Sequence, residues 1–428
     1  MADKKLSTEP YKGVRDFYPE QMFLQKYLFE KMRQTMEVFG YEEYGASILE
    51  PAELYRAKSG EEIVNEQTYT FLDRGEREVT LRPEMTPTLA RMVAQKKRDL
   101  TFPLRWYSLP NLFRYERTQR GRLREHFQLN VDIFGGEAGE SDLEILTVAY
   151  TLLKNLGAKD SDFKIIVNNR KIADRLFERI ELNDEQKYKI CKVIDKRNKI
   201  SDGEFKDAVK TLLAEKADRF LEIVDSNKKL VEVLGEQSPE VKELTGLIDG
   251  LYANGIKNVK FSQNLMRGFD YYTGMVFEIF DTDPKNSRSL FGGGRFDELL
   301  KIFGVESAPA VGFGAGDVTL LDFLETHNLL PEYQSATELY ICRLEAKFAK
   351  EINRLASNLR ERGVNVAVDL TDRKTAEQIK TADKKRIPFV LCFGEDEAKN
   401  KKYKIKRLAT GEEVEMGEKE IVNFLKRK

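Results

Sequence analysis

The chain has 428 residues, of which 41% are hydrophobic and 33% are charged, and its formal net charge is −1. This length predicts two or three domains, and no apolar segment approaches the roughly 20 residues that a membrane-spanning helix needs. Three widely spaced cysteines, two histidines and no apolar run behind the N-terminal lysines predict a cytoplasmic protein without structural zinc, a Ser/His/Asp triad or a secretory signal.

The N-terminal part predicts one amphipathic helix followed by a strand. Apolar residues recur at helical spacing from Glu20 to Phe39, and Gly40 closes this predicted helix. The next segment, YEEYGASILEP, predicts one strand that ends at Pro51.

A hairpin and a second helix are expected next. Thr68–Leu72 and Glu76–Leu81 flank the turn sequence Asp73-Arg74-Gly75 and therefore predict two antiparallel strands. The segment RPEMTPTLARMV then begins with Arg82-Pro83-Glu84 and continues at helical spacing.

The segment LFRYERTQRGRLREHFQLNVDIFG predicts a long antiparallel hairpin, with strands Leu112–Glu116 and Arg122–Phe134 around a charged turn. In the second strand one face is apolar apart from Glu125, because side chains alternate between the two faces. The other face consists of Arg122, Arg124, His126, Gln128, Asn130 and Asp132. Arginine grips phosphate in a fixed fork geometry, so this face predicts a phosphate- and substrate-binding surface. An ordinary amphipathic hairpin is the alternative.

The residues FRYERTQRGRLREHFQ resemble motif 2 of class II aminoacyl-tRNA synthetases, in the form that histidyl-tRNA synthetases use. The resemblance implies that Arg114 binds the α-phosphate of ATP, Arg122 the γ-phosphate, and that Glu116 accepts a hydrogen bond from adenine. It further implies that Gln128 holds the carboxylate region of histidine and that Asp132 bonds one imidazole nitrogen. Bacterial members usually have Glu at the place of Asp132, so the carboxylate here lies one methylene further back.

Two earlier segments resemble the same family. The helix and strand before Pro51 resemble motif 1, which builds the dimer interface, and so imply a homodimer. Arg82-Pro83-Glu84 followed by Thr86 resembles the RPE-x-T element, which implies that Glu84 and Thr86 hold the α-ammonium group of the amino acid. A carboxylate suits this task because a charge-assisted hydrogen bond fixes a cation.

The middle of the chain changes character. Helical spacing from Ser141 to Leu156 predicts a helix behind the sheet. From Ile172 to Ala253 the composition shifts to Lys, Glu, Asp and Leu at helical period, which predicts an inserted helical domain. Solvated surface explains its charged faces, and a contact with the tRNA acceptor stem is the alternative that the family implies.

Strand patterns return at Phe261 and at Met275–Phe280, and the most specific segment of the chain lies between them. RGFDYYTG closely resembles the RGLDYYTG signature of histidyl-tRNA synthetases, which other class II synthetases lack. The resemblance implies that Arg267 contacts the α-phosphate, acts in catalysis together with Arg114, and also belongs to the histidine-binding residues. It also implies that Tyr271 and Tyr272 shape the imidazole pocket, with Tyr272 bonded to the second imidazole nitrogen.

Two glycine-rich segments follow. Gly292–Gly294 predicts a close backbone approach or a flexible turn, and with Arg295 it resembles the family's GGGRYD segment. The segment APAVGFGAGDVTLL predicts a strand that enters a helix, where motif 3 is expected. The usual motif ends in GLER, whose Arg sandwiches the adenine and meets the γ-phosphate, but alignment at Gly316 leaves Thr319 at that position. Other groups of this chain are therefore expected to handle ATP.

The last part predicts an alternating α/β domain of about 90 residues. ELYICRL, PFVLCFG and KYKIKRL are strand runs, and Ala346–Arg362 is an amphipathic helix closed by Gly363. Val364–Asp369 and a basic helix that ends at Lys385 complete the pattern, which resembles the anticodon-binding domain of histidyl, threonyl, prolyl and glycyl enzymes. Residues 331–428 hold 22 Lys and Arg against 17 Asp and Glu, which fits a polyanionic partner or a Lys-rich solvated surface.

The predicted fold is an α+β catalytic domain with an antiparallel sheet, a helical insertion and a C-terminal α/β domain of the anticodon-binding kind. Residues 1–171 and 254–327 are expected to form the two parts of the catalytic domain. Residues 172–253 are expected to form the insertion, and residues 328–428 the anticodon-binding domain.

The resemblance implies ATP-dependent ligation of histidine to tRNA(His) through a histidyl-adenylate, with Mg²⁺ bound together with ATP and no metal ligands of the protein's own. The carboxylate of histidine attacks the α-phosphate, so catalysis rests on alignment and charge neutralisation without a general base. A catalytically silent paralogue, such as the regulatory subunit of ATP phosphoribosyltransferase, is the alternative. Such paralogues usually lack the C-terminal domain and lose the Arg/Tyr signature.

Overall fold

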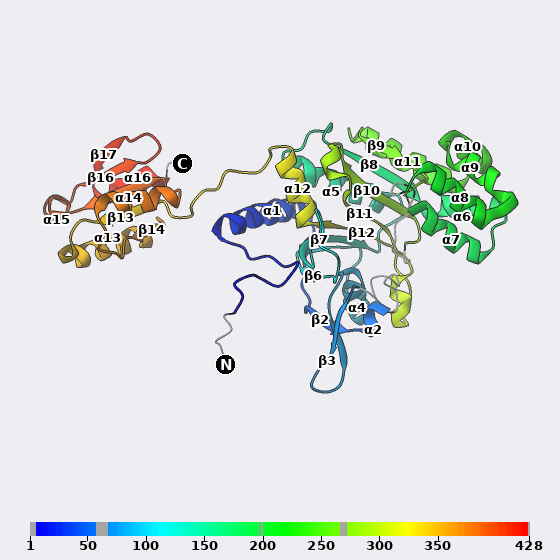
Figure 1. Cartoon of the computed structure of the whole chain (residues 1–428), viewed down its shortest axis with the longest axis horizontal. Helices are drawn as coiled ribbons and strands as arrows, with labels where there is room; N and C mark the ends of the chain where they lie inside the picture. Colours follow the sequence, from blue (N-terminus) through cyan, green and yellow to red (C-terminus); the bar gives the residue numbers. More distant parts are fainter. Residues whose placement is uncertain (1–5, 57–66, 196, 198–199, 266–271, 427–428) are drawn as a thin grey trace. The chain divides into compact units, whose positions relative to one another are not determined.

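The computed structural model of the chain forms two compact units, Met1–Leu330 and Pro331–Lys428. It describes residues 6–56, 67–195, 197, 200–265 and 272–426. The first unit contains a large and a small β-sheet, and the second unit has a sheet of its own (Figure 1). Within the described residues, no helix has both the length and the apolar content to cross a membrane.

The first unit is built on a nine-stranded sheet in the order β1-β5-β7-β12-β11-β10-β8-β9, with β6 paired to β7 alone. Its strands are β1 Glu42–Glu43, β5 Leu104–Ser108, β6 Asn111–Phe113, β7 Glu125–Phe134, β8 Phe163–Asn169, β9 Val259–Phe261, β10 Met275–Asp281, β11 Ser289–Arg295 and β12 Ala310–Gly316. The pairs from β5 through to β8 are antiparallel, whereas the outer pairs β1–β5 and β8–β9 are parallel. The predicted antiparallel catalytic sheet is therefore confirmed.

Three helices lie over one face of this sheet (Figure 1). They are α1 Pro19–Val38, α5 Glu140–Asn155 and α12 Asp317–Thr326. The apolar stripe of α1 and the odd-numbered residues of β7 meet in one core, which includes Leu28, Met32, Met36, Leu129, Val131 and Ile133. Each of these side chains is almost fully buried, which stabilises the fold by about 1.5–3 kcal/mol per residue.

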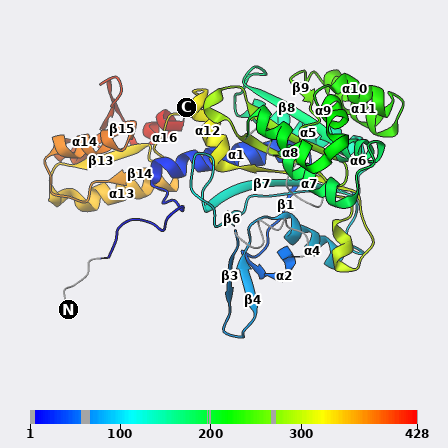
Figure 2. The ribbon, with the colours of Figure 1, turned by 45° about the vertical axis from the view of Figure 1, so that its right-hand side comes forward.

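The opposite face of the sheet is covered at one end by α4 Thr86–Lys96 and the 3₁₀ helix η4 Leu299–Phe303 (Figure 2). Leu89 and Val93 of α4 pack there with Phe134 and Phe296. The even-numbered side chains of β7 point to this same face because strand side chains alternate. Beyond the apolar end, the face carries the polar groups of β7.

A separate three-stranded antiparallel sheet belongs to the same unit, together with the short helix α2. The elements are β2 Leu49–Pro51, β4 Glu78–Leu81, β3 Tyr69–Leu72 and α2 Glu53–Arg56. The predicted hairpin is confirmed, with β3 and β4 antiparallel. Asp73 Oδ1 accepts hydrogen bonds from the N–H groups of Gly75 (2.8 Å) and Arg77 (3.0 Å), which closes the turn.

A strand does end at Pro51, as predicted, but the segment before it is divided into β1 and β2, which lie in two different sheets. Between them, Arg82 Nη1 donates to the carbonyl oxygens of Ala46 (2.8 Å) and Ser47 (3.3 Å). A buried side chain thus satisfies carbonyl groups that a neighbouring strand would otherwise bond. The backbone can therefore leave the large sheet at this point.

The long hairpin is antiparallel as predicted, but both of its strands are shorter. β6 ends at Phe113 and β7 begins at Glu125, so Glu116 and Arg122 lie outside the strands. The N–H of Glu125 donates to the carbonyl oxygen of Gly13 at 3.2 Å. The N-terminal segment therefore takes part of the backbone bonding that the prediction had assigned to the two strands.

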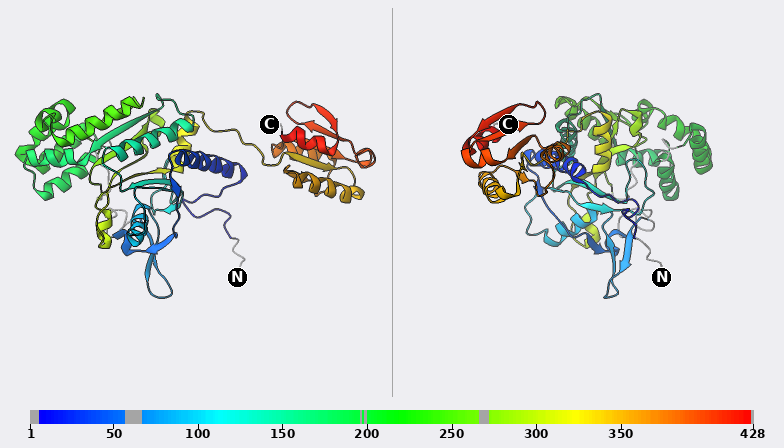
Figure 3. Two further views of the ribbon diagram at one scale, coloured as in Figure 1. Left: turned by 180° about the vertical axis from the view of Figure 1, so that it is seen from behind. Right: turned by 60° about the vertical axis from the view of Figure 1, so that its left-hand side comes forward.

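The segment between β8 and β9 is helical, as the composition predicts (Figure 3). It contains α6 Arg170–Arg179, α7 Asp184–Asp195, α8 Asp202–Leu213, η2 Ala214–Lys216, α9 Ala217–Val224, α10 Asn227–Leu234 and α11 Pro239–Ala253. Ser201 and Glu204 form a capping box at the start of α8. Apolar residues of these helices continue the core that lies beneath α1 and α5.

The second unit alternates strands and helices around a five-stranded sheet in the order β14-β13-β15-β16-β17. Its elements are β13 Leu339–Arg343, η5 Ala346–Phe348, α13 Ala349–Glu361, β14 Val366–Val368, α14 Thr375–Lys384, β15 Phe389–Phe393, α15 Glu395–Asn400, β16 Tyr403–Arg407, β17 Glu413–Met416 and α16 Glu418–Lys426. The first three strands are parallel, and the last two add antiparallel pairs. The predicted α/β fold is confirmed, although α15, β17 and α16 were not predicted.

A buried ion pair joins the large sheet to α5. Arg295 on β11 donates from Nη2 to Asp142 Oδ1 (2.6 Å) and to Ser141 Oγ (2.8 Å), and from Nη1 to Asp297 Oδ1 (3.0 Å). Arg295 and Asp142 are each about 1% exposed. Burial alone would raise the pKa of the Asp142 carboxyl, and the adjacent guanidinium opposes this rise. Arg295, at the end of the glycine-rich segment, therefore has a structural role, because it holds the sheet against α5.

Arg295→Met should lower the free energy of unfolding of the first unit by about 3–5 kcal/mol, because it leaves the Asp142 carboxylate buried without a cation. Arg33→Met is the matched control, since Arg33 pairs with Glu43 at the surface and its loss should cost at most about 1 kcal/mol. Urea denaturation of both variants measures the difference. Equal losses in the two variants would contradict the assigned role.

Candidate active site

Glycines of two adjacent strands form the floor of the candidate site. In the sheet register Asp132 pairs with Gly312, which pairs in turn with Gly294. A Cβ at Gly312 would lie 2.2 Å from Asp132 Oδ1, and one at Gly314 would lie 2.4 Å from Gln128 Nε2. The side chains of β7 therefore lie across the bare backbone of β12. The flexible turn considered for the triple glycine is wrong, because these residues lie inside β11.

Tyr272 approaches the same floor from the other side. A Cβ at Gly294 would lie 2.8 Å from Cδ1 of the Tyr272 ring, so the ring lies against the backbone of β11. Asp132 lies against Gly312 on the adjacent strand. The carboxyl and the phenol are thus on opposite sides of one row of glycine backbone.

A cavity of about 100 Å³ lies above this floor. It is lined by Glu84, Thr86, Arg114, Gln128, Asn130, Asp132, Tyr272, Gly292, Phe296, Gly312, Phe313 and Gly314. Thr86 begins α4, and Arg114 Nε donates to the carbonyl oxygen of Pro83 at 2.9 Å, which ties the loop after β6 to the RPE segment. Segments far apart in the sequence therefore contribute polar groups to one space.

Six of the residues that the sequence singled out line this cavity, namely Glu84, Thr86, Arg114, Gln128, Asp132 and Tyr272. Glu116 and Arg122 do not line it, and instead form an ion pair at 2.8 Å in the loop before β7. Arg267 and Tyr271 lie outside the described residues. Asn130 was placed on the polar face of β7 by alternation but was given no role, and Phe313 was not singled out. The position of Phe313 depends on strand pairing, which no short pattern gives.

The Asp132 carboxyl is buried and has no hydrogen bond or ion pair with any other described residue. Burial raises the pKa of Asp132 well above its usual value, because the charged form loses its hydration. A buried carboxyl without a partner costs stability, which a bound ligand with an N–H group or a positive charge would recover.

Gln128 is oriented by its neighbour on the same face of β7. Its Nε2 donates to Asn130 Oδ1 at 2.7 Å, and Asn130 Nδ2 donates to the carbonyl oxygen of Gln128 at 3.3 Å. The Gln128 amide also lines the cavity, and its Nε2 has a second N–H beyond the one that bonds Asn130. An N–H donor suits a carboxylate ligand.

His126 lies near the cavity among three arginines. Burial lowers the pKa of the His126 imidazole to about 3, and the positive charges of Arg114, Arg15 and Arg122 add to the effect. The ring is therefore neutral at neutral pH and leaves the positive charge of this region to the arginines. The alternation of side chains along β7 placed His126 on the polar face, but it predicted no role for the ring.

Asp317 and Thr319 occupy the start of α12, where the motif 3 pattern departs from the usual one. Asp317 Oδ2 pairs with Arg15 at 2.7 Å, and its Oδ1 accepts the N–H of Phe127 at 3.0 Å. Thr319 Oγ1 donates to the carbonyl oxygen of Leu290 at 2.6 Å. Both side chains therefore bond to the scaffold of the site.

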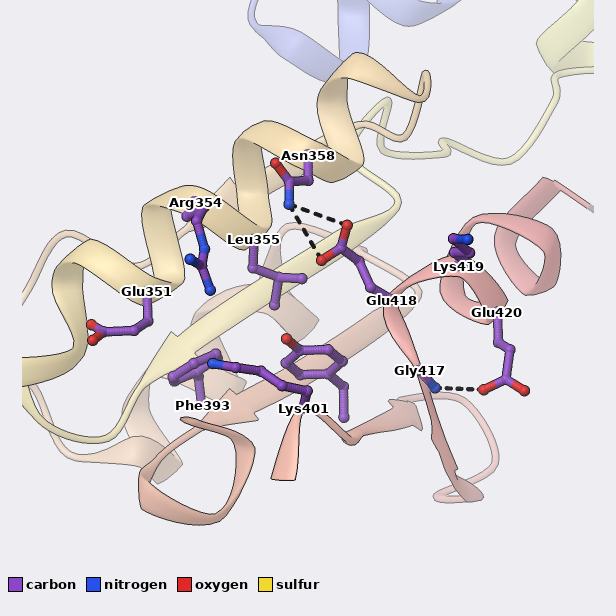
Figure 4. A pocket seen from close by; sticks show the side chains of 11 residues that line it. Glu351, Arg354, Leu355, Asn358, Phe393, Lys401, Gly417, Glu418, Lys419 and Glu420 are labelled. Atoms are coloured by element: carbon purple, nitrogen blue, oxygen red, sulfur yellow. Dashed lines mark hydrogen bonds between the residues drawn. The ribbon is translucent and has the colours of Figure 1, made fainter. Parts of the chain in front are cut away.

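The second unit contains a groove of about 650 Å³ between α13, β16 and the start of α16 (Figure 4). Arg354 and Asn358 extend into it from α13 (Figure 4), and Tyr403 of β16 also lines it. Asn358 Nδ2 donates to both carboxylate oxygens of Glu418, at 3.2 and 3.3 Å. The lining combines cations, carboxylates and an amide, which suits hydrogen bonding more than binding of a bare phosphate backbone.

The chain is similar to a known family along almost its whole length. Residues 13–320 match the family described as histidyl-tRNA synthetase, and residues 338–428 match the anticodon binding domain. The chain is 43% identical over 418 residues to the histidine–tRNA ligase of Leptospira biflexa, covering 96% of this chain and 95% of that protein. It is 38% identical over 412 residues to the histidine–tRNA ligase of Haloarcula marismortui, covering 94% of each.

Among solved structures, the crystal structure of histidyl-tRNA synthetase from a Nostoc species has the same fold, with a TM-score of 0.83. The match covers 99% of this chain and 100% of that chain at 24% identity. At this identity the similarity establishes the shared architecture and not the roles of individual side chains.

The imidazole of His126 should titrate with a midpoint of about 3. Because this pKa is below the unfolded value of about 6.5, neutral His126 contributes stability that is present above pH 6.5 and is lost as the pH falls toward 3. NMR of the protein labelled at histidine, with the His126→Asn variant to assign the signal, measures the midpoint. A midpoint near 6.5 would contradict the burial described above.

Proposed function

The chain belongs to the histidyl-tRNA synthetase family, and on that premise we propose how its residues join histidine to tRNA(His). Histidine and ATP first form histidyl-adenylate and pyrophosphate, and the histidyl group then passes to the tRNA. The similarity includes both the catalytic part and the C-terminal unit, which favours the ligase over a silent regulatory paralogue.

The observation that carries the assignment of the histidine site is the buried Asp132 carboxyl, which has no partner among the described residues and lies across the glycine floor from Tyr272. A flat imidazole fits above bare backbone, with one nitrogen donating to Asp132 and the other bonded to the Tyr272 hydroxyl. Glu84 and Thr86 then bind the α-ammonium group, and Gln128 binds the carboxylate region. All five side chains line the one cavity.

ATP is proposed to bind along the loop before β7. Arg114 at the cavity and Arg267, which lies outside the described residues, neutralise charge at the α-phosphate, while Arg122 binds the γ-phosphate. Glu116 accepts from the adenine amine, so its ion pair with Arg122 must open or be shared when ATP binds. Mg²⁺ enters with ATP as part of the substrate.

The first step is accelerated mainly by alignment of the histidine carboxylate with the α-phosphate of ATP. The histidine carboxylate is already ionised at neutral pH, so it attacks the α-phosphate without transfer of a proton to the protein. The described residues then act by orienting the two substrates and by stabilising the negative charge that develops on the oxygens of the α-phosphate. Cytoplasmic location and a homodimer built through the α1–β2 region remain part of this proposal.

The groove of the second unit is proposed to bind the anticodon of tRNA(His). The support is the match of residues 338–428 to the anticodon binding domain, together with a lining that can donate and accept hydrogen bonds. Unstacked bases of single-stranded RNA are read through such contacts at their edges. Arg354 forms no ion pair with another described residue, so its guanidinium is available for a base or phosphate.

Histidine alone among the amino acids should support ATP–pyrophosphate exchange by the purified protein. Asp132→Asn should raise the KM for histidine about 10–100-fold and leave the KM for ATP near the wild-type value, because a hydrogen bond to a charged group is weakened. Asp281→Asn is the matched control, since Asp281 is buried on the same sheet but bonds His327. A folded wild-type protein without exchange would contradict the proposed activity.

Arg354→Ala should raise the KM for tRNA(His) in aminoacylation about tenfold, the usual loss for one good base contact, and leave ATP–pyrophosphate exchange unchanged. Arg362→Ala is the control, because Arg362 pairs with Glu418 but does not line the groove. Steady-state aminoacylation with tRNA(His) transcripts measures both variants. An unchanged KM for tRNA in Arg354→Ala would refute this site.

A further inference from the structure

Thr319 cannot replace the arginine that motif 3 usually carries. Its hydroxyl donates to the carbonyl oxygen of Leu290 at 2.6 Å and lies 3.2 Å from that of Gly316. The side chain is short and neutral, and its one donor bonds to backbone. The phosphate site at this end of the sheet therefore needs a cation from another element.

Arg288 reaches the same place from the connection between β10 and β11. Gly121 marks the point of approach, because a Cβ there would lie 3.3 Å from Thr319 Cγ2 and 3.9 Å from Arg288 Cδ. Arg288 and Thr319 also line one cavity of about 70 Å³. The stem of Arg288 thus lies beside Thr319, the neutral residue that stands where motif 3 usually has an arginine.

Arg288 forms no ion pair or hydrogen bond with another residue in the described part of the chain. Its stem lies against Gly121, which directly precedes Arg122 in the chain, so the two arginines belong to one region of the surface. Partial burial and the charge of Arg122 lower the pKa of the Arg288 guanidinium, whereas Glu116 opposes this shift. Arg288 and Arg122 carry two positive charges, and Glu116 carries one negative charge. The net positive charge of this group favours the binding of an anion.

The other cations around this cavity differ from Arg288. Arg120 donates from Nε to Asn286 Oδ1 at 3.1 Å and from Nη2 to Thr326 Oγ1 at 3.4 Å, which fixes it to the scaffold. Lys285 lies in the 3₁₀ turn η3 Pro284–Asn286 and carries a point charge without a planar fork. Arg288 is therefore the cation of this cavity best suited to share a phosphate with Arg122.

We propose that Arg288, together with Arg122, binds the terminal phosphates of ATP, so that the cation for this subsite comes from the β10–β11 connection and not from α12. The inference rests on the proposed function, which supplies ATP as the substrate. An exposed arginine that is simply solvated is the alternative. That alternative predicts no effect of Arg288 on nucleotide binding beyond the effect of any other nearby cation.

Arg288→Ala should weaken ATP binding about 10–100-fold, since it removes a charge-assisted contact to phosphate. AMP, which lacks the terminal phosphates, should bind as tightly as it does to wild type, and the KM for histidine should not change. Isothermal titration with ATP and AMP, and ATP–pyrophosphate exchange, measure these effects. Lys285→Ala is the matched control, because it removes one positive charge from the same cavity and should leave ATP affinity close to wild type.

Three results would overturn the role of Arg288: unchanged ATP affinity in Arg288→Ala, an equal loss for AMP, or an equal loss in Lys285→Ala. Arg288→Lys provides a second variant, which should recover part of the ATP affinity because it restores the charge without the fork. A lysine variant no better than the alanine variant would contradict an ionic contact. Wild-type protein without histidine-dependent exchange would refute the proposed function, whereas active wild type with unaffected Arg288→Ala would refute this inference alone.

Discussion

The candidate site depends on the absence of side chains from the middle of β11 and β12. Because Gly312 pairs with Gly294 and Gly314 lies two residues further along β12, Asp132, Gln128 and Tyr272 can lie directly against the backbone of the sheet. Any Cβ at these positions would collide with the groups proposed to bind histidine. Glycine inside a strand costs about 0.5–1 kcal/mol each, and the dense core on the opposite face of the same strands offsets this cost.

The two faces of this sheet each carry a buried carboxyl, and the two carboxyls differ in their partners. This difference distinguishes a structural carboxyl from one that we assign to ligand binding. Asp142 has Arg295 within hydrogen-bonding distance, so this pair joins the sheet to α5. Asp132 has no partner among the described residues and faces a cavity. Protein side chains that are left without partners at a cost in stability mark where a ligand supplies the missing charge or hydrogen bond.

Local patterns predicted much of the fold because helix and strand periods are properties of short segments. The alternation in β7 identified the polar face that carries Gln128, Asn130 and Asp132, and the spacing of α1 identified its buried stripe. The predicted strands were too long because residues distant in sequence bond their backbone: Gly13 accepts the N–H of Glu125, and Gln67 accepts that of Tyr115. The pairing of glycines between β11 and β12 and the approach of Arg288 to Gly121 depend on the folded chain, and no short sequence pattern encodes them.

The most direct measurement is a crystal structure of the protein with histidine and an ATP analogue whose α–β bridge cannot be cleaved. We expect the imidazole above Gly294 and Gly312, with its two nitrogens bonded to Asp132 and Tyr272. An imidazole bound elsewhere, with Asp132 still unpaired beside an empty glycine floor, would contradict this expectation.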